Sequence, residues 1–146
     1  MGGAAPFWRT KSLEQMSRAE WESLCDGCAK CCLGKVEEPD TKRLVTTAVA
    51  CRLLDIEACR CSSYADRHRF VPDCVRLDPR KARKLAWLPS TCAYRRLANG
   101  DDLPDWHPLV TGDPDSVHAA GQSVRGRALS ERDAADPADH PAPWAE

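Results

Sequence analysis

The chain has 146 residues, with 21 Lys and Arg against 22 Asp and Glu and a formal net charge of −1 at pH 7. This balance argues against a general nucleic-acid or membrane-surface binder, and no stretch is long and apolar enough to cross a bilayer. The chain has only two Phe and two Tyr, and 11 Pro interrupt it, so the apolar core must be small. We therefore expect the fold to need a cross-link in addition to hydrophobic burial.

The length predicts one domain between two loose ends. Residues 1–11 carry Gly, Ala and Pro and predict a loose N-terminal arm. Residues 12–130 are expected to form a single cysteine-cluster domain. Residues 131–146 are rich in Ala, Asp and Pro with little to bury, which predicts a disordered acidic tail. No signal peptide is visible near the first residues, so we expect a cytoplasmic protein.

The first half of the domain predicts a helix followed by a β-hairpin. Ser17 and Glu20 match a capping box, and an apolar stripe after them predicts a helix that leads into Cys25. Two β-capable segments, Leu33–Glu38 and Arg43–Thr47, flank a Pro-Asp turn and predict a hairpin. The hairpin would return the chain toward the cysteines that precede it.

The second half predicts further short helices. Ser62 or Ser63 would cap a short helix over residues 64–70, and Asp78-Pro79 would start another that ends near Ala86. The next predicted helices are one capped by Ser90 or Thr91 that closes at Asn99-Gly100, and a short one over residues 115–120. The predicted fold class is a small irregular α+β domain, mainly short helices with one β-hairpin, stapled by a Cys-ligated metal centre.

The cysteines are the strongest functional signal. All nine lie between Cys25 and Cys92, and four fall within the eight-residue stretch CDGCAKCC. Clustered thiolates repel one another unless a cation such as Zn²⁺ or an iron–sulfur unit neutralises them. In a reducing cytosol, this pattern favours a metal site over disulfides. The predicted ligands are Cys25, Cys28, Cys31, Cys32, Cys59, Cys61, Cys74 and Cys92, with Cys51 and His107 as further candidates.

Four arginines lie close to the later cysteines in sequence: Arg52, Arg60, Arg67 and Arg76. A positive side chain beside a multi-thiolate site would offset its negative charge and keep the thiolates ionised. The alternative is that these arginines are simply solvated. The sequence leaves both interpretations open for each of them.

Several strings carry a resemblance to a known family. The run Cys25-x2-Cys28-x2-Cys31-Cys32, with "VACRLLDI", "CRCSSY", "VPDC", "WLPSTCAYR" and "WHPLVTGD", resembles the bacterial CxxCxxCC cysteine-cluster family, in its YcgN-like branch. The match covers about Phe7 to Glu131. The resemblance implies a small cytoplasmic protein whose cysteines chelate zinc or iron. More distant proteins with a similar cluster include a flagellin lysine methylase with an associated iron–sulfur site.

We consider three functions. On chemistry alone, zinc is slightly favoured over iron as the bound metal. The first is a zinc or iron protein whose Cys-ligated sites serve as a scaffold or in metal handling. The second is an iron–sulfur redox or accessory protein that serves a larger enzyme. The third and weakest is a zinc module that binds nucleic acid through a basic helix face, which is formed by Arg80, Lys81, Arg83 and Lys84. The sequence contains no catalytic motif, and it leaves a protein partner and the oligomeric state open.

Overall fold

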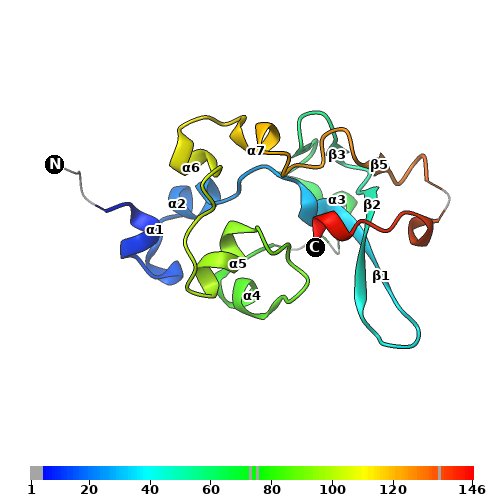
Figure 1. The fold of residues 1–146 in the computed structure, drawn as a ribbon, viewed down its shortest axis with the longest axis horizontal. Coiled ribbons are helices and arrows are strands. Elements are labelled where there is room, and N and C mark those ends of the chain that lie inside the picture. Colours follow the sequence, from blue (N-terminus) through cyan, green and yellow to red (C-terminus); the bar gives the residue numbers. More distant parts are fainter. Residues whose placement is uncertain (1–4, 73, 75, 135) are drawn as a thin grey trace. The chain divides into compact units, whose positions relative to one another are not determined.

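The computed structural model describes residues 5–72, 74, 76–134 and 136–146. It is a small α+β fold of short helices and a few short strands (Figure 1). The chain divides into two compact units, and the single domain expected over residues 12–130 stays a prediction. Unit 1 comprises the described residues of Met1–Asp26 and Leu77–Ala120, and unit 2 comprises those of Gly27–Arg76 and Gly121–Glu146.

Unit 1 is helical. Its α-helices are α1 (Phe7–Thr10), α2 (Arg18–Ser23), α4 (Pro79–Lys84), α5 (Ala93–Ala98), α6 (Pro108–Thr111) and α7 (Ser116–Ala119), with a 3-10 turn η1 (Leu13–Gln15). The capping box before α2 is confirmed, because Ser17 Oγ accepts from Glu20 N at 3.1 Å and Glu20 Oε1 accepts from Ser17 N at 2.9 Å. The predicted start of α4 is also confirmed, since Asp78 Oδ1 accepts from Lys81 N at 2.8 Å.

The start of α5 differs from the prediction. Cys92 is its N-cap, with no side-chain cap bond, so the expected caps Ser90 and Thr91 are wrong. The cause is a preceding turn in which Cys92 N donates to Pro89 O at 2.9 Å, and this turn takes up both residues. The predicted end is confirmed, because Asn99 is the C-cap and the next glycine has a φ of 84°.

One apolar cluster holds unit 1 together. Its buried members are Leu13, Leu24, Ala82, Ala93, Tyr94 and Leu103. The ring of Tyr94 lies 4.6 Å from that of Trp21, and its hydroxyl donates to Trp21 O at 2.8 Å. Two residues that precede η1 contact this unit: Trp8 Nε1 donates to Asp102 Oδ1 at 3.1 Å, and Arg9 forms an ion pair with Asp102 at 2.7 Å.

Unit 2 contains the described strands. They are β1 (Leu33–Glu37), β2 (Leu44–Ala50), β3 (Leu54–Asp55), β4 (Arg60–Cys61) and β5 (Leu129–Ser130), with α3 (Arg67–Phe70) and the 3-10 turns η2 (Lys30–Cys32), η3 (Pro137–Asp139) and η4 (Pro143–Ala145). The predicted hairpin is confirmed as the antiparallel pair β1–β2, in which Val36 faces Val45. The strand β5 pairs in parallel with β2, and β3 pairs with β4.

The C-terminal segment packs against β2 within unit 2 (Figure 1). Ala48 N donates to His140 O at 2.7 Å, and Ala142 N donates to Thr46 O at 2.8 Å. The methyl groups of Ala142 and Ala145 are buried in the apolar cluster of this unit. The disordered tail expected over residues 131–146 stays a prediction from composition, and we return to its test below.

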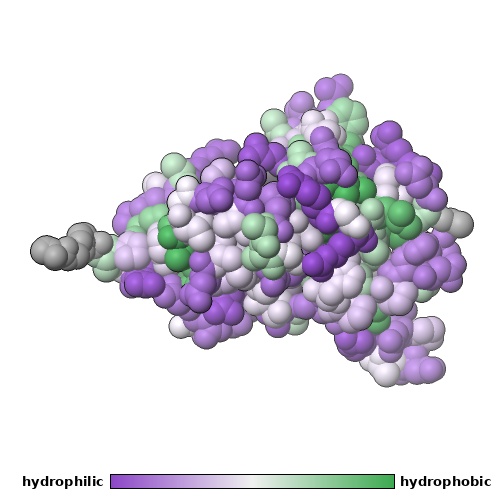
Figure 2. All heavy atoms as spheres, turned by 45° about the horizontal axis from the view of Figure 1, so that its top comes forward, coloured by the Kyte–Doolittle hydropathy of each residue, from purple (hydrophilic) through white to green (hydrophobic). Residues whose placement is uncertain are grey.

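Hydrophilic residues cover most of the face shown in Figure 2. On the face shown in Figure 2, hydrophobic residues form small groups that are separated by hydrophilic ones. Among the described residues, no helix has the length and apolar character that a bilayer span requires.

Candidate metal centre

The first four cysteines lie in a loop with two left-handed residues. Gly27 has a φ of 81° and Ala29 has a φ of 64°, so the three-residue spacing of the thiols does not follow one regular helix. The chain then enters η2, which carries the last two of them. Burial differs along the loop, because Cys28 is buried while Cys25 and Cys31 are exposed.

The hairpin returns the chain to this loop. Leu33 pairs with Ala50 across β1 and β2. One residue beyond that pair, Cys51 N donates to Cys32 O at 2.9 Å. Two half-buried thiol residues that are 19 positions apart are therefore held side by side by backbone hydrogen bonds.

Cys51 also belongs to a second group of thiols. Burial raises the pKa of Cys74, Arg67 lowers it through its charge and a hydrogen bond, and the charges of Cys51 and Cys61 raise it. Each charge effect requires that the residues lie near one another in a partly desolvated region. Cys51, Cys61 and Cys74 are hereafter called the thiol triad.

A short helix holds Cys74 in this group. His68, on α3, has its Nε2 atom 2.7 Å from Cys74 O, while Arg67 on the same helix lowers the pKa of the Cys74 thiol, chiefly through its charge. The end of α3 is fixed in turn, because Arg52 Nη2 donates to Phe70 O at 2.5 Å. Of the arginines singled out in the sequence, two therefore have identified structural roles beside the thiols.

A lysine accompanies the adjacent pair Cys31 and Cys32. Burial lowers the pKa of Lys35, while the charges of Cys31 and Cys32 raise it. Its Nζ donates to Leu33 O at 3.0 Å. Lys35 was not a sequence candidate. The register of β1 against β2 shifts between Leu33 and Lys35, so strand alternation in the sequence could not place this lysine.

Two predicted ligands lie in apolar surroundings. Cys59 is buried in the core of unit 2, where its φ is 54° and its Sγ donates to Ile56 O at 3.3 Å. Cys92 is half-buried and packs against the apolar cluster of unit 1. Their role as ligands stays a prediction.

His107 is fully buried in unit 1. Its Nδ1 accepts from Leu109 N at 3.0 Å, and its Nε2 lies 2.8 Å from Leu24 O. Because both ring nitrogens are engaged by backbone groups, metal coordination would require one of these bonds to break. The His107 ring thus supports the backbone just before Cys25.

The donor set suits a soft or borderline cation. None of the nine cysteines, all of which lie in the described part of the chain, is joined in a disulfide, and thiolates are the ligands that Zn²⁺ and iron–sulfur clusters share. Within the described residues, no three Cys, His, Asp or Glu side chains are already positioned to bind one metal ion. A metal would therefore draw together thiols that the backbone has already brought near one another.

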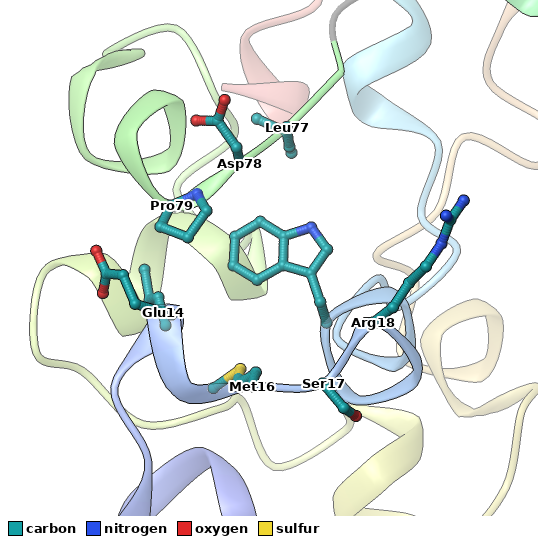
Figure 3. Close-up of a pocket in the computed structure, with 9 residues that line it drawn as sticks. Glu14, Met16, Ser17, Arg18, Leu77, Asp78 and Pro79 are labelled. Carbon is teal, nitrogen blue, oxygen red and sulfur yellow. The ribbon is translucent and has the colours of Figure 1, made fainter.

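A separate open cavity of about 310 Å³ lies in unit 1. Its apolar lining comes from Leu13, Met16, Trp21, Leu77 and Pro79. Figure 3 shows the charged ends of Glu14 and Arg18 pointing away from it. The Glu14 carboxylate binds Arg83 at 2.5 and 2.9 Å, and Asp78 caps α4. Because no Cys or His is among its described lining residues, the cavity does not belong to the thiol site.

Comparison with known proteins identifies the family of this chain. Residues 24–93 match the model of the family CxxCxxCC, which is described as "Putative zinc- or iron-chelating domain". A UPF0260 protein of Rhizorhabdus wittichii is 61% identical over 140 residues, which are 96% of this chain and 96% of the relative. A UPF0260 protein of Granulibacter bethesdensis is 56% identical over 99% of this chain and 87% of the relative. No solved structure matches the chain at a significant level.

Proposed function

This chain belongs to the UPF0260 family of proteins with a CxxCxxCC region, and we propose that unit 2 binds zinc or iron through cysteine thiolates. The thiol triad carries the proposal, because Cys51 and Cys61, though distant from Cys74 in sequence, lie close enough to Cys74 for their charges to raise its pKa. Cys32 is the proposed fourth ligand, since its carbonyl already accepts from Cys51. When bound, the metal supplies a positive charge that neutralises the thiolates and cross-links the segments that carry them.

The composition of the unit 2 core supports a structural role for the metal. Four of the eight buried residues in its apolar cluster are alanines: Ala29, Ala50, Ala142 and Ala145. Alanine side chains bury little apolar surface, and hydrophobic stabilisation scales with the buried area at about 25 cal/mol per Å². A structural zinc site in a small domain contributes about 10 kcal/mol or more of apparent binding free energy. The scaffold function is therefore our first proposal.

An iron–sulfur centre is the second proposal. It rests on the C-x2-C-x2-C order of Cys25, Cys28 and Cys31, which opens a bacterial ferredoxin motif, and on the iron in the family description. In this alternative, the chain serves as a redox or accessory protein for a larger enzyme. The two proposals predict purified proteins that differ in colour and in sulfide content.

The nucleic-acid proposal is weaker. Of the basic side chains on α4, Arg83 already binds Glu14, and this hydrogen bond is the main cause that lowers the pKa of Glu14 to about 2. One charge of the basic face is therefore compensated within the chain. Nucleic-acid binding through the rest would have to weaken steeply with added salt.

Metal analysis tests the proposal. The full chain, purified without oxygen and without added metal, is expected to retain stoichiometric zinc or iron. A colourless zinc protein supports the structural site, whereas a brown protein with equivalent sulfide supports the iron–sulfur centre. Cys61→Ser and Cys74→Ser are expected to lose that metal, because a neutral hydroxyl is a poor substitute for a thiolate.

Cys92→Ser is the matched control. Serine is a favoured N-cap, so this variant should preserve the start of α5, and we expect it to keep its metal. Loss of metal from Cys92→Ser would instead support the wider ligand set expected from the sequence. Full metal content in both Cys61→Ser and Cys74→Ser would refute the thiol triad as the donor set.

A further inference from the structure

Two cysteines lie opposite each other at the open end of the β1–β2 hairpin. Leu33 pairs with Ala50 in the antiparallel register. One further step along each segment places Cys32 opposite Cys51, and the backbone bond from Cys51 N to Cys32 O, at 2.9 Å, continues the ladder there. The register shift of the hairpin begins beyond Leu33, on the side away from Cys32. The two cysteines are therefore in register across the hairpin.

Opposed positions of this kind have the backbone spacing that a disulfide needs. Residues joined by such a ladder bond have Cα atoms about 5.5 Å apart, and disulfides span about 4.4–6.8 Å between Cα atoms. Their side chains leave the same face of the hairpin, with Cβ atoms about 4.5–5.5 Å apart. Because a disulfide holds its Cβ atoms about 3.8 Å apart, the two side chains must approach by about 1 Å. A disulfide that closes with such strain is more easily reduced than an unstrained one.

The neighbouring thiols are less suited to this bond. Cys31 is exposed but directly precedes Cys32, and consecutive Cα atoms lie about 3.8 Å apart, which is below the usual disulfide range. Cys28 and Cys59 are buried, so an oxidant in solution reaches them less easily. Cys32 and Cys51 are both half-buried. The pair across the hairpin thus combines access with the required backbone spacing.

We propose that a peroxide joins Cys32 and Cys51 in a disulfide across the hairpin, and that this bond removes two thiolate donors from the metal site. One thiol attacks a peroxide oxygen, the O–O bond breaks, and a sulfenic acid and one water form. The second thiol attacks the sulfenic sulfur, which forms the S–S bond and releases a second water. Overall, two thiols lose two electrons and two protons, and one hydrogen peroxide becomes two waters. The disulfide itself needs no metal, whereas the loss of donors rests on the proposed function.

Peptide mapping tests the bond. The full chain is treated with hydrogen peroxide, the remaining thiols are alkylated, and trypsin digestion follows without a reductant. Cleavage after Lys and Arg puts Cys32 in the peptide of residues 31–35 and Cys51 in that of residues 44–52, so the expected product is a cross-link between these two peptides. Dithiothreitol should reverse it.

The variants identify which thiol of peptide 31–35 reacts. Cys31→Ser is the matched control and should keep the cross-link, whereas Cys32→Ser should abolish it. No cross-link in the wild type, or a cross-link from peptide 44–52 to the peptides of Cys61 or Cys74, would overturn the inference. Should a variant fail to fold, fragmentation of the wild-type cross-linked peptide makes the same assignment.

Zinc release separates this inference from the proposed function. The reduced full chain is loaded with Zn²⁺, and peroxide should release the zinc in step with formation of the cross-link. A cross-link that forms while all the zinc stays bound would overturn the loss of donors. Bound zinc without any cross-link after peroxide would overturn the bond itself. A reduced chain that binds no zinc and still forms the cross-link would refute the zinc form of the proposed function and support the disulfide.

Discussion

At the scale of single residues, the His107 ring has a defined tautomer. A backbone N–H can only donate and a carbonyl can only accept, so the bonds to Leu109 N and Leu24 O leave Nδ1 unprotonated and place the proton on Nε2. The ring is therefore neutral. Its position, fully buried between two backbone segments, indicates a structural role in unit 1.

His107→Ala is expected to destabilise the protein, because a buried polar group that loses its partner costs about 1–3 kcal/mol. His107→Asn provides a matched comparison, since asparagine is a good N-cap that can still accept from Leu109 N but cannot reach Leu24 O. Urea unfolding should rank the wild type first, His107→Asn second and His107→Ala last. Both variants should keep their metal. Loss of metal without loss of stability would instead identify His107 as a ligand.

At the scale of elements, the C-terminal segment completes the environment of β2. The edge of this strand bonds to β5 at its end and to residues near Pro141 along its middle. Glu146 adds a contact from its carboxylate to Arg43 at 2.5 Å and another to Thr46 N at 3.2 Å. Covering a strand edge in this way prevents unwanted pairing with other chains. The same strand leads into Cys51.

Hydrogen exchange should distinguish packing of this segment from the disorder that its composition predicts. In the full chain, we expect slow exchange at Ala48 and Ala142, whose amides donate to backbone carbonyls across the segment. Exchange at Ala138, which is exposed, serves as the internal reference and should be faster. Uniformly fast exchange from residue 136 onward would show that this segment is disordered, as its composition predicts.

Local signals explain which elements the sequence could predict. The starts of α2 and α4 and the β1–β2 turn depend on residues within four positions of one another, so caps and turns reveal them. The pairing of Val49 with Leu129 depends on residues 80 positions apart, and no local pattern encodes it. The same distinction between local and long-range information holds for the candidate site. Spacing identified the cysteines, whereas only the fold shows that Cys74 lies near Cys51.

At the scale of the whole molecule, the thiols are unequally distributed. Unit 2 contains seven of them: Cys28, Cys31, Cys32, Cys51, Cys59, Cys61 and Cys74. Its apolar cluster is built mainly from small side chains, whereas that of unit 1 includes several leucines and Tyr94. The unit with the weaker apolar core thus has most of the potential metal ligands. This distribution is what a fold that relies on sulfur-bound metal would require.

X-ray absorption at the metal edge tests the central claim most directly. It is applied to the full chain as purified without oxygen, and it reports which atoms surround the ion. We predict a first shell dominated by sulfur, at about 2.3 Å if the metal is zinc. A first shell of nitrogen and oxygen alone would contradict thiolate binding, and so would a folded protein that contains no metal.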